Sequence, residues 1–146
     1  MNHAGRFLLL SILLFFPFLL LAQDQAGLDY WNQISQKTIE TESGLQYKVR
    51  IMGKGRKPKG RNTVAVHYRG MLLDGFVFDS SYDDPEPIKL NLKRVIKGWT
   101  EGIQLMPEGS VFVFLIPSEL AYGERGTTGI PPDSPLLFEI ELYEIK

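Results

Sequence analysis

Apolar and polar residues alternate along most of the C-terminal two-thirds of the chain, and this pattern restricts the fold most strongly. Alternation places successive side chains on opposite faces of a strand, so one face of each segment can be buried. The alternating segments are 45–51, 63–69, 88–92 and 136–143. Residues 111–116 are apolar at every position and predict a strand covered on both faces. An Asp-Gly turn signal at 74–75 predicts a hairpin between residues 63–71 and 76–79.

A single short helix is predicted in the second half of the chain, where Trp99, Ile103 and Met106 recur at helical spacing. The helix has one apolar stripe and each strand has at least one face to bury, so these elements must pack in layers. We therefore expect an α+β fold in which a curved antiparallel sheet of about five strands wraps around one short α-helix. The concave space between the sheet and the helix would hold a pocket.

Residues 1–22 have the composition of a secretory signal peptide. Arg6 belongs to a short basic start, the 16 residues from Phe7 to Ala22 carry no charge, and Ala22 is a small residue at the cleavage position. The alternative is an uncleaved membrane anchor. Sixteen helical residues span roughly 24 Å, less than the ~30 Å hydrocarbon core, and this favours cleavage after Ala22. We therefore expect an exported protein that is attached to a membrane only if this segment is not cut.

Residues 23–42 form a polar N-terminal extension in which a few apolar residues recur three apart, a spacing that predicts a short helix. These residues are Leu28, Trp31 and Ile34. In the apolar strand, alternate side chains face away from the core and would leave an exposed apolar surface. The outward-facing residues are Val111, Val113 and Leu115. We expect residues 27–39 to form a short helix that covers this outer face, or the same face of a second copy.

The composition of the chain excludes several kinds of chemistry. There is no cysteine, which excludes disulfide bonds and thiol catalysis, and the two histidines suggest no metal-ligand cluster. His67 is expected on the strand face opposite Tyr68, and we assign it no catalysis. The net charge of −1 gives no general attraction to nucleic acid. Residues 53–61 are basic but contain no aromatic side chain, which favours a solvated loop over a nucleic-acid site. We therefore predict no metal, cofactor or nucleic acid.

Several short motifs follow one another in the region 43–146 without a large insertion between them. They include Val66-His67-Tyr68-Arg69-Gly70, Phe78-Asp79-Ser80-Ser81, Val95-Ile96-Lys97-Gly98-Trp99 and Ala121-Tyr122-Gly123. In these motifs the region resembles the FKBP-type peptidyl-prolyl isomerases, the immunophilins that bind tacrolimus. The resemblance implies that residues 43–146 form an isomerase domain. With its signal peptide, the chain is similar to the exported bacterial members, which implies a location in the bacterial periplasm.

The activity implied by the resemblance is rotation about the imide bond that precedes proline in exported polypeptides. The rotation barrier is ~18–20 kcal/mol, and no proton or electron has to move. The twisted transition state has lost amide resonance and carries less charge on its oxygen than the planar ground state. A dry apolar pocket therefore destabilises the planar imide relative to the twisted one. Such a pocket needs aromatic walls and few polar groups.

The resemblance implies five catalytic residues. They are Tyr68, Asp79, Ile96, Trp99 and Tyr122. Trp99 would form the floor beneath the proline ring, Tyr122 would direct its hydroxyl toward a substrate carbonyl, and the Ile96 amide would be a second anchor. Asp79 would either hold a hydrogen-bond network with Tyr68 or sense the twisted carbonyl. We expect Asp79 to serve the geometry of the pocket more than proton transfer.

Five further residues would bind the substrate by the same resemblance. They are Phe78, Ile88, Val95, Ile130 and Phe138. Ile130, in a long loop, would close over the ligand, and Ile88 replaces the bulkier residue usual in the family. Related proteins often carry a basic residue that could pair with Asp79, whereas here Asp83 and Asp84 follow and would favour cationic peptides nearby. The same resemblance implies macrolides such as tacrolimus as a further class of ligand.

Two functions are compatible with this pocket. The first is catalysis of prolyl isomerisation, which the complete set of aromatic and polar residues favours. The second is a non-catalytic proline-peptide-binding module or holdase chaperone that uses the same apolar surface. An isomerisation assay on residues 23–146 would distinguish them, because only the first accelerates the reaction.

Overall fold

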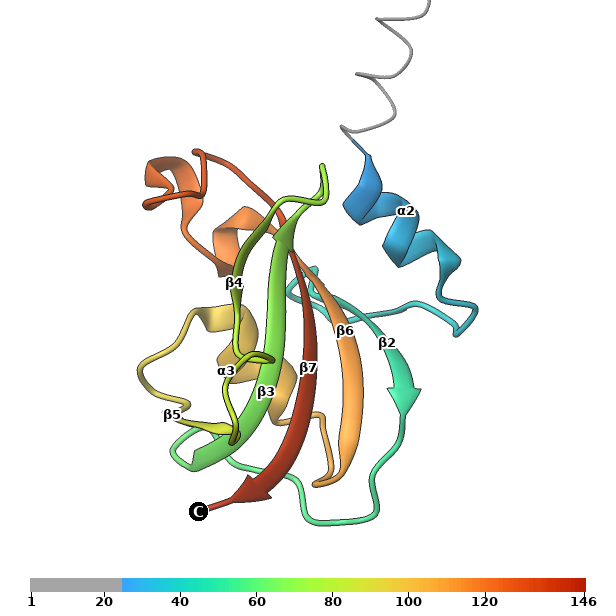
Figure 1. The fold of residues 1–146 in the computed structure, drawn as a ribbon, viewed down its shortest axis with the longest axis vertical. Helices are drawn as coiled ribbons and strands as arrows, with labels where there is room; N and C mark the ends of the chain where they lie inside the picture. The colour runs from blue at the N-terminus through green and yellow to red at the C-terminus, as the bar shows by residue number, and fades with distance from the viewer. Residues whose placement is uncertain (1–24) are drawn as a thin grey trace, which may run out of the picture.

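The computed structural model describes residues 25–146 (Figure 1). The predicted signal peptide at residues 1–22 lies outside this part of the chain. The elements are α2 (Ala26–Gln33), β1 (Ile39–Glu40), β2 (Gln46–Ile51), β3 (Thr63–Leu72), β4 (Val77–Ser80), β5 (Ile88–Asn91), α3 (Lys97–Ile103), β6 (Ser110–Ile116), the 3-10 helices Ser118–Leu120 and Gly123–Arg125, and β7 (Leu136–Ile145). Within residues 25–146, every helix is too short or too polar to cross a bilayer.

All strand pairs are antiparallel and form one sheet in the order β1-β2-β6-β7-β3-β4, with β5 also paired to β3. The predicted α+β class and the hairpin between β3 and β4 are confirmed. The described residues form seven strands rather than about five. The two-residue β1 is too short to show alternation. The ten-residue β3 also pairs with two separate short strands, β4 at one end and β5 at the other.

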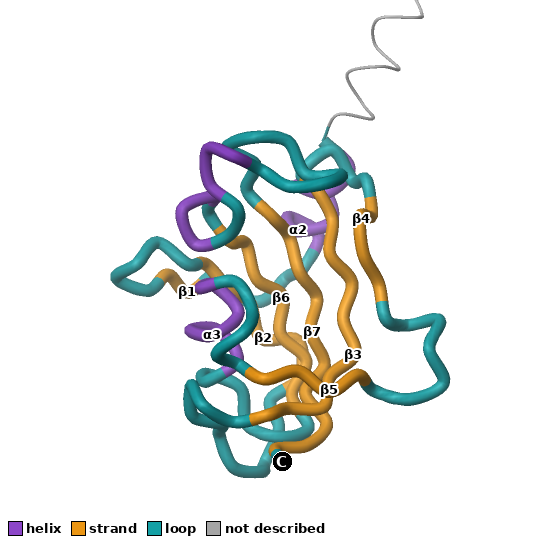
Figure 2. The backbone as a smooth tube through the Cα atoms, turned by 90° about the vertical axis from the view of Figure 1, so that its left-hand side faces the viewer, coloured by secondary structure: helices purple, strands orange, loops and turns teal. Residues whose placement is uncertain are grey.

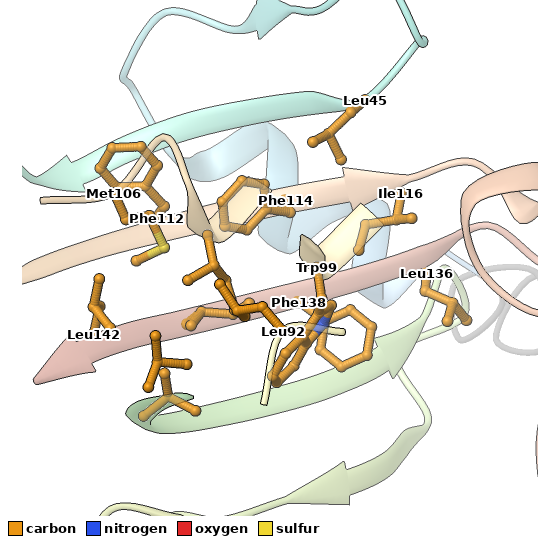
Figure 3. Close-up of a cluster of buried hydrophobic side chains, with 14 of the residues drawn as sticks. Leu45, Leu92, Trp99, Met106, Phe112, Phe114, Ile116, Leu136, Phe138 and Leu142 are labelled. Atoms are coloured by element: carbon orange, nitrogen blue, oxygen red, sulfur yellow. The ribbon is translucent and has the colours of Figure 1, made fainter. Parts of the chain in front are cut away.

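The main hydrophobic core lies on the concave face of the sheet, where α3 packs (Figure 2). The helix approaches β6 closely because two of its residues are glycines. A Cβ at Gly98 would lie 2.5 Å from Ile116 Cγ2, and one at Gly102 would lie 2.7 Å from Phe114 Cε1. Figure 3 shows the side chains that fill the space between helix and sheet, which include Leu45, Leu92, Met106, Phe112, Phe114, Ile116, Leu136 and Leu142. Burying each of these side chains contributes about 1.5–3 kcal/mol.

The opposite, outer face of the sheet is covered by α2, so the predicted role of the N-terminal extension is confirmed for the chain's own sheet. This second cluster contains Trp31, Met71, Val113 and Leu137, with Tyr30, Ile34 and Leu115 packed against it. The outward-facing Val111 and the helix residue Leu28 lie outside the cluster. The helix predicted for residues 27–39 ends at Gln33, and residues 39–40 form β1 instead, so α2 covers only part of the outer face.

Charged side chains beneath α2 fix the helix to the sheet. The buried Lys48 donates hydrogen bonds from Nζ to the carbonyl oxygens of Trp31 (3.0 Å) and Ile34 (2.9 Å), the exposed carbonyl end of the helix. Its ammonium group also lies 4.8 Å from the centre of the Trp31 ring. Nearby, the buried Glu139 accepts hydrogen bonds from Tyr30 and Arg50. Lys48 and Glu139, the two buried charged residues of this face, therefore both have partners, whereas the buried Nε of the partly exposed Arg69 has none among residues 25–146.

Candidate functional site

A pocket of about 500 Å³ opens between the concave face of the sheet, the start of α3 and the loop after β6. Eleven residues line it: Tyr68, Phe78, Asp79, Leu90, Arg94, Val95, Ile96, Trp99, Ala121, Tyr122 and Phe138. They come from five strands or helices and two loops, so the pocket exists only in the folded chain. Most of the lining is apolar or aromatic, and only two of these residues are charged at neutral pH.

The base of the pocket is a cluster of aromatic rings packed edge to face around Trp99. The Trp99 ring centre lies 4.9 Å from that of Tyr68 and 5.2 Å from that of Phe138, at interplanar angles of 84° and 85°. Phe78 stands against Phe138 in the same way, at 5.5 Å and 84°. Trp99 is buried, and its indole N–H has no acceptor among residues 25–146. The rings therefore give the pocket a rigid and dry floor.

Gly70 creates the space for these rings. It lies in β3 directly opposite Phe138 of β7 and Asp79 of β4. A Cβ at this position would lie 2.6 Å from Phe138 Cε1 and 2.7 Å from Phe78 Cζ, closer than real Cβ atoms approach any neighbour. The glycine of the Tyr68-Arg69-Gly70 motif is thus required by the packing of the pocket walls.

At one edge of the pocket, a hydrogen bond joins side chains of the neighbouring strands β3 and β4. The Tyr68 hydroxyl donates to Asp79 Oδ2 over 2.5 Å, and the Tyr68 amide donates to the buried hydroxyl of Ser81 over 2.8 Å. Burial, followed by the hydrogen bond to Asp79, raises the pKa of Tyr68 well above its usual value. Tyr68 therefore remains a hydrogen-bond donor throughout the neutral and mildly alkaline range, and it holds the Asp79 carboxylate in place.

Two further groups of the pocket lining carry hydrogen-bond donors. Ile96 lies just before α3, and its carbonyl oxygen accepts the amide hydrogens of Trp99 and Thr100. Its own amide N–H has no acceptor among residues 25–146, and the residue lines the pocket. On the other side, Tyr122 lies in the loop after β6 and is 40% exposed. The pocket thus offers an amide and a hydroxyl donor above an apolar floor.

Eight of the ten site residues predicted from the sequence line this pocket, and two do not. Ile130 is buried in the main core, and its backbone forms a two-way bridge with Thr127 that fixes the loop. Ile88 begins β5 opposite Val66 and packs against the core outside the pocket. In this structure neither residue closes over the pocket.

Sequence reasoning missed three residues of the lining. Leu90 and Ala121 belong to an alternating strand and to a recognised motif, so a signal for each was present. Arg94 lies in the turn before α3 and carries no pattern that distinguishes it from other surface cations. The structure also shows no cluster of three or more potential metal ligands among residues 25–146.

Comparison with known proteins places these features in a family. A family model described as FKBP-type peptidyl-prolyl cis-trans isomerase matches residues 54–143. The chain is 57% identical over 115 residues to the FKBP-type peptidyl-prolyl cis-trans isomerase FkpA of Aeromonas hydrophila, covering 79% of the chain and 43% of the relative. It is 47% identical over 122 residues to FkpA of Escherichia coli K12, covering 82% of the chain and 45% of the relative.

Solved structures agree with the sequence matches. The crystal structure of FkpA from Escherichia coli superposes with a TM-score of 0.74 at 42% identity, covering 86% of this chain and 60% of that one. A peptidyl-prolyl cis-trans isomerase from Pseudomonas syringae pv. tomato DC3000 gives a TM-score of 0.70 at 35% identity, with coverages of 86% and 94%. The chain spans less than half the length of the two FkpA sequences it matches.

Proposed function

The chain belongs to the FKBP-type peptidyl-prolyl cis-trans isomerase family, and from this premise we propose that it accelerates rotation about X-Pro bonds in exported polypeptides. The observation that carries the proposal is the ring cluster around Trp99, which forms the floor of a pocket that contains a single carboxylate. Rotation about an imide bond needs no nucleophile. It is favoured where water is removed from the imide, and the apolar lining of this pocket would do that.

The proposed mechanism is desolvation of the substrate imide combined with anchoring of its neighbours. The proline ring lies on Trp99, between the walls formed by Tyr68, Phe78 and Phe138. An apolar surrounding disfavours the planar imide, whose oxygen carries more charge than in the twisted transition state. Each 1.4 kcal/mol of this difference accelerates rotation by about tenfold. The uncatalysed reaction takes tens to hundreds of seconds, so a difference of a few kcal/mol already gives a large acceleration.

The polar residues of the pocket hold the substrate in register. The Tyr122 hydroxyl and the Ile96 amide donate to substrate carbonyl oxygens, which fixes the peptide on either side of the rotating bond. Asp79, held by Tyr68, shapes the edge of the pocket near that bond. These assignments rest on where the residues lie in the pocket lining and on the free amide of Ile96.

An isomerisation assay tests this function. The chain, purified after expression in an exporting bacterium, should accelerate cis–trans conversion of an Ala-Leu-Pro-Phe peptide in proportion to its concentration. Trp99→Leu should lose most of this acceleration while its circular dichroism remains that of the folded protein. Peptide binding without acceleration would instead support the non-catalytic binding module or holdase chaperone.

Export and macrolide binding are parts of the same proposal. The composition of residues 1–22 supports cleavage after Ala22 and release into the periplasm, which the intact mass of the purified protein tests.

We also propose tacrolimus as a ligand, since its ring system requires an apolar cavity of the kind that Trp99 and Phe138 line. It should inhibit the assay competitively with the peptide.

A further inference from the structure

Arg94 supplies the only positive charge among the residues that line the pocket. Its position is fixed by a tight turn. The carbonyl oxygen of Asn91 accepts the Arg94 amide over 2.9 Å, and the Asn91 side chain accepts the Lys93 amide over 2.9 Å. Between them, the fully buried Leu92 anchors the turn in the core. The turn therefore fixes the backbone of Arg94, an exposed residue, next to the pocket that it lines.

The charges around the pocket leave Arg94 free to act on a ligand. Asp79, the other charged residue of the lining, accepts the Tyr68 hydroxyl, and no described acidic group forms an ion pair with Arg94. The acidic residues of the loop between β4 and β5, which favour cationic peptides by their sequence, lie outside the lining. They are Asp83, Asp84 and Glu86. A carboxylate on a bound peptide would therefore have Arg94 as its only cationic partner in the lining.

We propose that Arg94 makes the protein favour prolines that have an aspartate or glutamate as a neighbour. The inference rests on the proposed function and adds a substrate class to it. When the proline ring lies on Trp99, the residues flanking it lie at the rim, where the guanidinium can pair with a carboxylate. Exposed ion pairs contribute little, so the preference for the charged peptide over its neutral isostere should be about two- to fivefold.

The test compares peptides that differ only in charge. We would measure kcat/KM for Ala-Glu-Pro-Phe and Ala-Gln-Pro-Phe, and for a second pair with glutamate or glutamine after the proline. The wild-type protein should show a Glu/Gln ratio of about two to five in one of the pairs. Arg94→Gln should bring that ratio to about one, and Arg94→Glu should invert it. Added salt should reduce the wild-type ratio, because the pair is exposed.

Lys93→Gln is the matched control, since Lys93 is an exposed cation one residue away that does not line the pocket. It should leave the ratio unchanged. The inference is overturned if the wild type and Arg94→Gln have the same Glu/Gln ratio of kcat/KM. If the wild type still accelerates Ala-Leu-Pro-Phe in that case, the proposed function is unaffected. An equal loss of the Glu preference in Lys93→Gln would also overturn it, because the general electrostatic attraction of the surface cations would then explain the preference. Failure of the wild type to accelerate any peptide would overturn the proposed function as well.

Discussion

Gly70 shows how a single residue determines the shape of the site. It has no side chain at the point where Phe78 and Phe138 come together over β3. The two rings can therefore pack edge to face and continue the aromatic wall that begins at Trp99. A methyl group there would have to displace one ring or the strand itself.

We predict that Gly70→Ala damages both stability and activity. The free energy of unfolding should fall by about 1–3 kcal/mol, because the added Cβ overpacks a region that is already filled. Displacement of the two rings should lower kcat/KM by about tenfold to a hundredfold. Gly60→Ala is the control, since its Cβ would meet only the end of the flexible Gln104 side chain, at 3.1 Å. Urea denaturation and the peptide assay measure both effects, and a fully active Gly70→Ala would contradict this account of the pocket.

The hydrogen bond between Tyr68 and Asp79 gives a second prediction. Tyr68→Phe keeps the ring and removes the donor, so the Asp79 carboxylate loses its fixed position. We expect kcat/KM to fall by about tenfold, the equivalent of one hydrogen bond of ~1–1.5 kcal/mol. Asp79→Asn should cause a similar loss, and the double variant should lose little more than either single one. Losses that multiply in the double variant would show that the two residues act independently.

The sequence predicted most of the pocket at the scale of residues, and its failures have physical causes. Trp99 and Tyr68 belong to motifs that resemble those of FKBP-type isomerases, and this resemblance implied their place in the pocket. Ile130 lies in a long loop, where no periodicity indicates which side chains turn inward, and the bridge to Thr127 places it in the core. Arg94 was missed because its role depends on a turn that brings it beside strands distant in the sequence.

Helix α2 is the element that protects the outer face of the sheet. Its single large anchor is Trp31, which is 6% exposed and packs on Val113 and Leu137. The helix has no side-chain cap at its start, and Lys48 satisfies two carbonyl groups at its other end. An isolated helix of eight residues is unstable in water, so α2 depends on this contact with the sheet.

We predict that Trp31→Ala destabilises the protein by about 3–5 kcal/mol, the usual cost of removing a buried aromatic side chain. At temperatures well below the melting point, kcat/KM should remain that of the wild type, because α2 and the pocket lie on opposite faces of the sheet. Asp29→Ala, an exposed position on the same helix, serves as the control. Deletion of residues 23–40 should also lower the melting temperature, and an equally stable truncated protein would contradict the role assigned to α2.

Strands were easier to predict than helix limits. Alternation identified β7, whose Phe138, Ile140 and Leu142 face the main core. The first five residues of this strand are nonetheless all buried, because α2 covers the other face at Leu137. The helix α3 ends at Ile103, although the apolar spacing extends to Met106. Met106 is fully buried just past the helix, since a tight turn following α3 also directs it into the core. Apolar spacing reports burial, and burial alone does not show where a helix ends.

The free energy of unfolding of the whole molecule should depend on pH in the alkaline range because of three of its tyrosines. Burial raises the pKa values of Tyr30 and Tyr68, each of which donates a hydrogen bond to a carboxylate. Partial burial also raises the pKa of Tyr82, which is still 41% exposed, to about 12. In the unfolded chain all three titrate near 10. The unfolded state therefore loses protons first, and the free energy of unfolding falls as the pH rises above about 10. Below that pH these groups contribute their full stabilisation.

Urea midpoints measured between pH 8 and pH 11 test this sign. We expect a constant contribution from the tyrosines up to about pH 9 and a decline above pH 10. Tyr82→Phe should make the decline shallower, which separates the tyrosine effect from the titration of lysines. A midpoint that rises between pH 10 and pH 11 in the wild type, or an identical slope in Tyr82→Phe, would contradict the prediction.

The position of β7 has a consequence for how the protein is made. This strand lies between β6 and β3, and it contributes Phe138 to the pocket. A nascent or partly translocated chain that ends near residue 135 has no strand to join the two halves of the sheet, and the edges of β3 and β6 remain unpaired. Such edges readily associate with other chains. Until residues 136–145 are made, the domain therefore has two unpaired strand edges that favour aggregation, and its pocket lacks Phe138.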